Sequence, residues 1–168
     1  MFRNCTIQMK KIFRNFKAYA LITGAASGMG RIYAQRLSGM GYNLVLVDIN
    51  GKGLQDAADR IYEITEAAGC EVEVLVNNAG VMYCQGMAQT SERMLKLIMS
   101  VHMTTPLMLC RKYVGGMKER GCGYILNVSS LAAWMIWPGI GMYGCTKRFV
   151  KDYSRELRIE CQKTGVSV

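Results

Sequence analysis

Apolar residues fall into two kinds of pattern along the chain, short uninterrupted runs and longer stretches that repeat every three to four positions. The short runs, at 18–24, 42–50, 72–78 and 123–130, have the length and composition of strands buried in a parallel sheet. The longer stretches, at 29–41, 51–69, 90–120 and 142–165, have the spacing of amphipathic helices. Residues 166–168 resemble the start of one more strand. This alternation predicts a three-layer α/β fold, a doubly wound parallel sheet with helices on both faces.

The composition is that of one globular domain, which we place at 18–168. The chain has 168 residues, of which 51% are hydrophobic and only 2 are proline. It contains no uninterrupted apolar run long enough to predict a transmembrane helix. Its seven cysteines are scattered, odd in number and without a CxxC pair. We therefore expect free thiols in a cytoplasmic protein, with no disulfide scaffold and no metal site.

Residues 1–17 stand apart because they are strongly basic. The net charge of the chain is +9, and this segment contributes five positive charges and no acid, namely Arg3, Lys10, Lys11, Arg14 and Lys17. Its apolar residues have helical spacing, so we expect a short, partly helical leader. Binding to a membrane surface is conceivable for such a segment. Nucleic acid is not expected, because no basic patch interleaved with aromatic residues recurs later in the chain.

The segment TGAASGMG, residues 23–30, joins the first predicted strand to the first predicted helix. Gly24 permits a tight turn, Gly28 lets a pyrophosphate approach the backbone, and Gly30 lets the helix pack close to the strand. The N-terminus of the helix offers unpaired N–H groups to phosphates. Glycines are common in turns, but this strand–turn–helix context favours a Rossmann-type dinucleotide site. The predicted cofactor contacts are Gly24, Ser27, Gly28, Met29 and Gly30.

Asp48 lies at the end of the second predicted strand. A carboxylate there can accept hydrogen bonds from both hydroxyls of the adenosine ribose, and it repels a 2′-phosphate. This position therefore favours NAD over NADP as cofactor. The alternative is an aspartate that only stabilises the turn after the strand.

Tyr143 and Lys147 are spaced i and i+4 on a predicted helix, so their side chains point the same way. An ammonium beside a phenol stabilises the phenolate, and such a tyrosine can exchange a proton with an alcohol or carbonyl oxygen. Ser130 ends the run NVSS, 13 residues before Tyr143. Its hydroxyl could hold the substrate oxygen beside the tyrosine, because ligand sites in such sheets lie at the carboxyl ends of strands. Ser129 is the competing candidate.

Together TGAASGMG, Asp48, NNAG (77–80), NVSS and YGCTK resemble the short-chain dehydrogenase/reductase family over nearly all of 18–168. The segments around NVSS and YGCTK look most like its ketoacyl-thioester and 17β-hydroxysteroid reductase branch. The resemblance implies that Tyr143 is the acid/base, that Lys147 also holds the nicotinamide ribose and that Ser130 orients the substrate. It implies that Asn77, Ala79 and Gly80 shape the cofactor cleft. It further implies a homodimer or homotetramer in contact through 90–120.

One position departs from the family pattern within the expected site. The family's active-site asparagine, which holds a helix kink and an ordered water in a proton relay, aligns with His102. Histidine is polar and titrates near neutrality, so His102 could replace the asparagine in catalysis. The alternative is a packed, hydrogen-bonded side chain.

The second departure is an absent unit. The family has two helices and a strand between Asp48 and the NNAG turn, whereas this chain has one helix, so a unit of roughly 20–30 residues is missing. Because crossovers are right-handed, a return from the second strand past the first puts the helix at 51–68 on the opposite face. Either that helix has switched faces, or the sequence omits residues near 70–74. We favour omission or truncation, since absent units would expose large apolar patches.

These observations predict an NAD(H)-dependent oxidoreductase that acts on a secondary alcohol or ketone. A truncated, inactive nucleotide-binding or partner module is the alternative. The family continues past the position of Val168 and takes much of its substrate pocket from there. An apolar carbonyl substrate is suggested by the loop before Tyr143, which contains Trp134, Met135, Ile136 and Trp137. The same residues could instead pack against another subunit.

Overall fold

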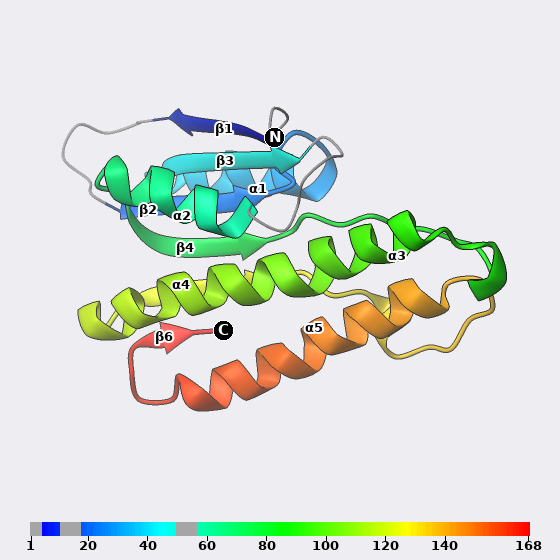
Figure 1. Ribbon diagram of the computed structural model, residues 1–168. Helices are drawn as coiled ribbons and strands as arrows, with labels where there is room; N and C mark the ends of the chain where they lie inside the picture. Colours follow the sequence, from blue (N-terminus) through cyan, green and yellow to red (C-terminus); the bar gives the residue numbers. More distant parts are fainter. Residues whose placement is uncertain (1–4, 11–17, 50–56) are drawn as a thin grey trace.

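A six-stranded sheet forms the centre of the computed structural model, which describes residues 5–10, 18–49 and 57–168. The strand order is β1-β3-β2-β4-β5-β6, and Figure 1 shows these strands with their helices. The strands are β1 (Cys5–Lys10), β2 (Ala18–Thr23), β3 (Asn43–Ile49), β4 (Glu71–Asn77), β5 (Gly123–Asn127) and β6 (Val166–Ser167). The strands from β2 to β6 run parallel to one another, and β1 runs antiparallel to β3. The Rossmann-like α/β prediction is confirmed.

The helices follow the predicted order. They are α1 (Gly28–Gly39), α2 (Ala57–Ala67), α3 (Glu92–Met99), α4 (Thr105–Arg120) and α5 (Gly141–Glu160). The stretch predicted as one helix at 90–120 is a single helical run in which α3 and α4 are joined by the π-helical turn η2 (Ser100–Thr104). Short 3₁₀ turns, η1 (Met87–Gln89) and η3 (Leu131–Ala133), stand in the loops. A π-turn inside a longer helix often marks a functional position.

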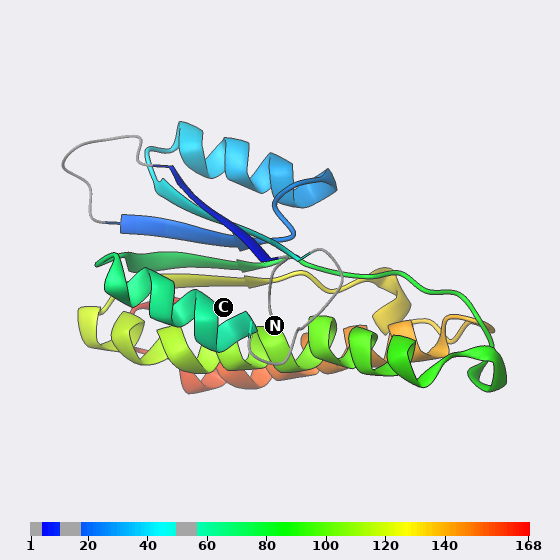
Figure 2. The same cartoon turned by 45° about the horizontal axis from the view of Figure 1, so that its top comes forward.

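The sheet has a separate apolar core on each face. On one face α1 packs over β2 and β3, around Ala34, Ile22 and Leu44. On the other face α2, α4 and α5 cover the sheet, and Ile61, Leu109 and Leu157 belong to that larger core. Figure 2 shows α1 alone on one side of the strands and the other long helices on the opposite side. Most buried strand positions are aliphatic, as parallel strands covered on both faces require.

The position of α2 follows the first of the two alternatives. It lies on the face opposite α1, where it packs against α4. The chain passes from β3 to β4, which lie on opposite sides of β2, and a right-handed crossover in that direction requires this face. The observed strand order therefore needs no residues between β3 and β4 beyond those in this sequence.

The basic segment at the N-terminus is only partly as expected. Residues 5–10 form β1, so the prediction of a helical leader is wrong for them. β1 pairs with the whole of β3, from Cys5 opposite Ile49 to Lys10 opposite Leu44. Doubly wound sheets of this type place their third strand beside the second, and β1 occupies that edge in the reverse direction. The sequence CTIQMK alternates polar and apolar residues, which suits a strand better than a helix. The remainder of the leader lies outside the described residues.

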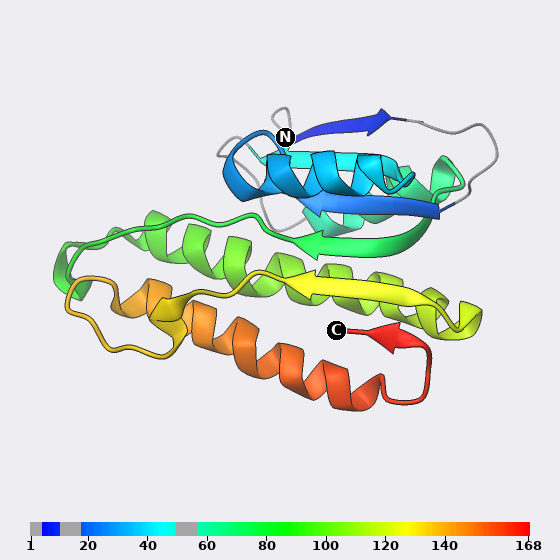
Figure 3. The same ribbon diagram turned by 180° about the vertical axis from the view of Figure 1, so that it is seen from behind.

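In the part of the chain that the structure describes, no helix covers the β5 and β6 side of the sheet on the face of α1 (Figure 3). Figure 3 shows β5 and β6 from that side without a covering helix. Tyr124 and Leu126 of β5 are accordingly exposed, at 49% and 42%. This agrees with the expectation that absent units uncover apolar surface. Among the described residues, no helix is long and apolar enough to cross a membrane.

Candidate active site

A cleft of about 340 Å³ opens at the carboxyl ends of β2, β3, β4 and β5. Nine of the predicted site residues line it: Gly24, Ser27, Gly28, Met29, Asp48, Ala79, Gly80, Tyr143 and Lys147. Four others, Gly30, Asn77, His102 and Ser130, are not part of its lining. The predicted cofactor-binding residues and the pair Tyr143 and Lys147 are distant in the sequence, and they meet at this cleft.

The glycine turn is shaped by close backbone contacts. Gly24 has a left-handed φ of 67°, and a Cβ on it would lie 2.9 Å from Cα of Ala79. A Cβ on Gly30 would lie 2.0 Å from the carbonyl oxygen of Gly24, so Gly30 is required by packing behind the cleft. Gly28 differs, because a Cβ there would meet nothing within 4 Å. The backbone at Gly28 is therefore open to the cleft at the N-terminus of α1, as a pyrophosphate site needs.

Asp48 both holds the turn and faces the cleft. Its Oδ2 accepts a hydrogen bond of 2.8 Å from the backbone N–H of Ala26. This contact stabilises the glycine turn after β2, whereas the alternative that we considered was the turn directly after β3. A carboxylate has about four acceptor positions, so the same side chain can also accept hydrogen bonds from a ligand in the cleft that it lines.

The NNAG turn is fixed to the glycine turn by Thr23. The hydroxyl of Thr23 accepts hydrogen bonds from the backbone N–H groups of Asn78 and Ala79, each at 3.1 Å. The amide of Asn78 donates in return to the carbonyls of Thr23 and Gly24. Asn78, which we did not predict, therefore forms the cleft wall. Asn77, predicted as a cofactor contact, is only 6% exposed and bonds to Asn127 behind the cleft, because successive strand residues point to opposite faces.

Tyr143 and Lys147 lie in the first two turns of α5 and both face the cleft. The Nζ of Lys147 lies 5.9 Å from the centre of the Tyr143 ring and donates a 2.8 Å hydrogen bond to the carbonyl of Val128. Burial lowers the pKa of Lys147 to about 8, so the amine remains mainly a cation at neutral pH. A positive charge therefore stands beside the phenol, as its predicted role as a proton donor or acceptor requires.

The two serines of NVSS have different surroundings. Ser129 lines the cleft, and its hydroxyl donates a 2.8 Å hydrogen bond to the carbonyl of Lys147, which fixes the strand end to α5. The hydroxyl of Ser130 accepts from the backbone N–H of Ala132 at the start of η3. Accepting one bond leaves the Ser130 proton for another acceptor. Its assignment to the substrate oxygen stays a prediction.

His102 is buried in the π-helical turn and uses both ring nitrogens. Nε2 accepts a 2.9 Å hydrogen bond from the backbone N–H of Val81, and Nδ1 lies 2.9 Å from the hydroxyl of Thr146. That hydroxyl donates to the carbonyl of Tyr143, so Nδ1 must carry the proton and donate. Burial, and secondly the charge of Lys147, lower the pKa of His102 to about 4. These contacts agree with the packed alternative, and a catalytic role for His102 stays a prediction.

Two of the residues that we missed had a partial signal in the sequence. Thr146 lies between Tyr143 and Lys147 in YGCTK, and Asn78 is the second asparagine of NNAG. Both could have been found by asking which neighbours of a predicted site residue point to the same side. The carbonyl of Val128, which binds Lys147, has no sequence signal, because every residue has a carbonyl.

Comparison with known proteins found relatives whose sequences align with most of this chain. It is 31% identical to 17-beta-hydroxysteroid dehydrogenase type 3 from Danio rerio, over 93% of this chain and 60% of that protein. It is also 31% identical to a very-long-chain 3-oxoacyl-CoA reductase from Anas platyrhynchos, over 90% and 57%. A third relative, 28% identical over 94% and 55%, is the human protein named inactive hydroxysteroid dehydrogenase-like protein 1. The chain therefore spans somewhat more than half the length of the curated relatives that it matches.

The first of these alignments runs over 183 residues, more than the 168 of this chain, so the relative contains residues without a counterpart here. A solved 3-ketoacyl-(acyl-carrier-protein) reductase from Brucella melitensis, complexed with NADH, has a TM-score of 0.80 and 28% identity, covering 90% of this chain and 73% of its own. The family described as short chain dehydrogenase matches this sequence in two overlapping pieces, 18–70 and 55–168. The overlap contains α2, which thus corresponds to two places in the family pattern, as expected where a unit is missing. With the cleft, the glycine turn and YGCTK in place, the chain belongs to the short-chain dehydrogenase family.

Proposed function

We propose that this chain carries the catalytic site of an NAD(H)-dependent oxidoreductase that acts on a secondary alcohol or ketone. The main observation that supports this proposal is that Tyr143 and Lys147 line the same cleft as the glycine turn and Asp48. The open backbone at Gly28 and the N-terminus of α1 suit the phosphates of a dinucleotide. A nicotinamide bound in this cleft would supply or accept the hydride.

The residues of the chain would handle the proton. In reduction, Tyr143 gives its phenolic proton to the substrate oxygen as that oxygen gains negative charge, and in oxidation it accepts the proton. The ammonium of Lys147 stabilises the phenolate that results. His102, with its ring 5.5 Å from that of Tyr143 and nearly perpendicular to it, limits how the phenol can turn.

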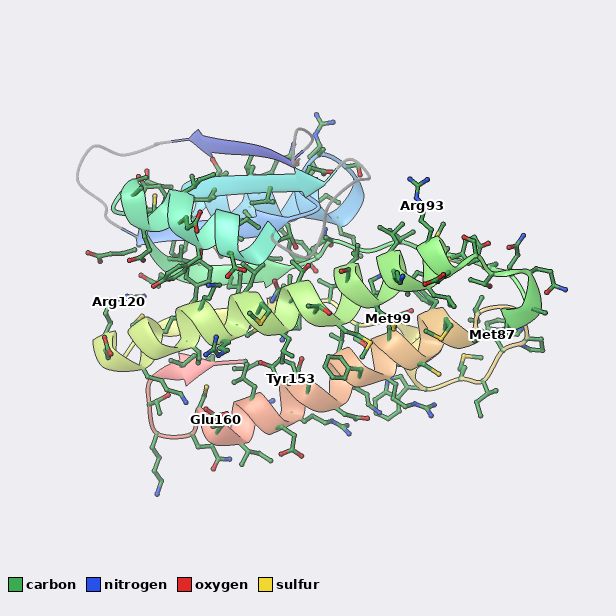
Figure 4. The ribbon with its side chains drawn as sticks, viewed as in Figure 1. Met87, Arg93, Met99, Arg120, Tyr153 and Glu160 are labelled. Carbon is green, nitrogen blue, oxygen red and sulfur yellow. The ribbon has the colours of Figure 1, made fainter. Side chains whose placement is uncertain are left out.

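The test is an assay of NADH oxidation with ketone and 3-oxoacyl thioester substrates. Tyr143→Phe should lower turnover by about 100- to 10,000-fold, the usual contribution of a general acid, and leave the dissociation constant of NADH unchanged. Tyr153→Phe is the matched control on the same helix, because Tyr153 packs against the core between α4 and α5, away from the cleft (Figure 4). Equal turnover in Tyr143→Phe and the control would refute the proposal.

We propose NAD rather than NADP because Asp48 places a carboxylate in the cleft after β3. Asp48→Ala should weaken NADH binding by about 10- to 100-fold, as loss of charge-assisted hydrogen bonds predicts. NADPH binding should be unchanged or stronger, since the repulsion of the 2′-phosphate is removed. Asp152→Ala, an exposed aspartate of α5 that pairs with Lys151, is the control. A similar loss for both cofactors would mean that Asp48 serves only the turn.

An inactive nucleotide-binding module is the second candidate. It is supported by the saturated hydrogen bonds of His102 and by one relative whose name contains the word inactive. This candidate predicts NADH binding without turnover in the unmodified chain. The assay above therefore separates the two.

The substrate, the assembly and the location are proposed on lesser grounds. Trp134, Ile136 and Trp137 are exposed, Ile136 at 93%, in the loop before α5, and they support an apolar carbonyl substrate. The family membership supports a homodimer or homotetramer through α3 and α4. Five cysteines, Cys84, Cys110, Cys122, Cys145 and Cys161, form no disulfide, which supports a cytoplasmic location.

A further inference from the structure

Two buried side-chain oxygens stand out behind the cofactor turn. Among the described residues, Oδ1 of Asn77 and Oγ1 of Thr105 are buried without a hydrogen-bond partner. Asn77 is 6% exposed and Thr105 is 5% exposed. Both line the same small cavity of about 10 Å³, together with Thr23, Ala79, Val101 and Pro106. An unsatisfied buried oxygen costs about 1–3 kcal/mol, so a pair of them at one cavity calls for a ligand.

The side chains of Asn127 and Thr23 give no donor to Oδ1 of Asn77. The amide nitrogen of Asn77 donates to Oδ1 of Asn127 at 2.7 Å and to Sγ of Cys110 at 3.4 Å, which fixes the orientation of the amide. The hydroxyl of Thr23 already donates to the carbonyl of Val76 and accepts two backbone N–H groups. The oxygen of Asn77 therefore needs a donor that enters from the cavity.

We propose that one ordered water occupies this cavity and bridges Asn77 to Thr105. Its volume is about that of one water-sized sphere, the minimum that a buried water requires. The water would donate one proton to Oδ1 of Asn77 and accept the proton of the Thr105 hydroxyl. Its second proton can go to a backbone carbonyl of the adjoining π-helical turn, because Pro106 has no N–H to offer there.

This water would be a positioning element of the cleft. Asn77 ends β4 directly before the cofactor turn, and Thr105 begins α4 directly after η2. Val81, at the other end of the turn, is tied to the same helical run by His102. The NNAG turn would thus be held to the long helix at both ends. The proposal concerns the folded chain and stands whether or not the proposed oxidoreductase activity is found.

Thr105→Val tests the proposal by the sign of its effect, with Thr105→Ser as the matched control. Valine has nearly the shape of threonine but lacks the hydroxyl, whereas serine keeps the hydroxyl. If the water is present, Thr105→Val should lower the midpoint of thermal unfolding by several degrees relative to Thr105→Ser. It should also weaken NADH binding a few-fold. If the hydroxyl is unhydrated, its removal relieves an unsatisfied group, so a midpoint equal to or above that of Thr105→Ser would overturn the proposal.

A crystal structure of the whole 168-residue chain at high resolution gives the second test. We expect a density peak within hydrogen-bonding distance of both Oδ1 of Asn77 and Oγ1 of Thr105, and its loss in Thr105→Val. A direct hydrogen bond between the two side chains, with no peak, would also overturn the proposal.

Discussion

The two halves of the molecule follow the doubly wound pattern to different degrees. The C-terminal half, from β4 to β6 with α3, α4 and α5, keeps the family order, and its polar side chains form a connected network around Tyr143 and Lys147. The described residues of the N-terminal half, from β1 to α2, lack one parallel strand and one helix of the family pattern. There an antiparallel β1 takes the edge of the sheet and α2 takes the opposite face.

The difference shows which parts of the fold position the site. The cleft is made by the ends of β2, β3, β4 and β5, and the loss of a unit between β3 and β4 leaves the order of these strands unchanged. Right-handed crossover then fixes the face of α2 without reference to the site. A loss of this kind can therefore change the sheet edge while the groups around the cleft stay in place.

The largest effect on this comparison should come from Gly30, where α1 packs against the glycine turn behind the cleft. A Cβ at Gly30 would lie 2.0 Å from the carbonyl oxygen of Gly24, so Gly30→Ala should push α1 away from the NNAG turn. We expect a loss of about 3 kcal/mol in the free energy of unfolding, as overpacking of this kind costs, with loss of NADH binding. Urea unfolding and NADH fluorescence would measure the two effects.

Gly39→Ala is the matched control on the same helix. A Cβ at Gly39 would meet nothing within 4 Å, and alanine is the better helix former, so this variant should be slightly more stable, by about 0.5 kcal/mol. If Gly30→Ala behaved like Gly39→Ala, the close packing of α1 on the glycine turn would be incorrect.

The next effect concerns the C-terminal half and its dependence on pH. The pKa of His102 is lowered from 6.5 to about 4 in the folded chain, so between these values the unfolded chain binds the proton and the folded chain does not. Stability therefore falls as the pH falls through this window, by about 3 kcal/mol in total for this one group. Protonation would also turn Nε2 into a donor that faces the N–H of Val81.

His102→Gln isolates this contribution, because an amide can accept from Val81 and donate to Thr146 without titrating. Urea unfolding of both proteins would be measured at steps from pH 7 to pH 4.5. Over this range the free energy of unfolding of the unmodified chain should fall by about 2–3 kcal/mol more than that of the variant. Acidic groups shared by the two proteins cancel in this difference. Parallel pH profiles would show that the imidazole is not held in the neutral form.

The sequence was sufficient wherever a local pattern decides the structure. β2 and the turn after it follow from a short apolar run and from glycines that permit a tight turn. The pairing of Tyr143 with Lys147 follows from their i, i+4 spacing on one helix. Crossover handedness gave the switched face of α2 as one of two alternatives, although we favoured an omission of residues. The tie between His102 and Val81 was not predictable, since it joins a helix to a loop whose relative position depends on the whole core.

β1 was mispredicted for a related reason and leads to the smallest expected effect. Its alternating residues suit a strand, and the edge of β3 lets that strand form because it offers a row of unpaired N–H and C=O groups. Removal of residues 1–10 should lower the free energy of unfolding by about 1–2 kcal/mol, the contribution of a few cross-strand pairs. It should also promote association, which sedimentation at increasing concentration would detect, while removal of residues 1–4 keeps β1 whole and should do neither. If both truncated chains unfolded and sedimented like the full chain, β1 would not contribute to the sheet, and the N-terminal half would depend on β2, β3 and their two helices alone.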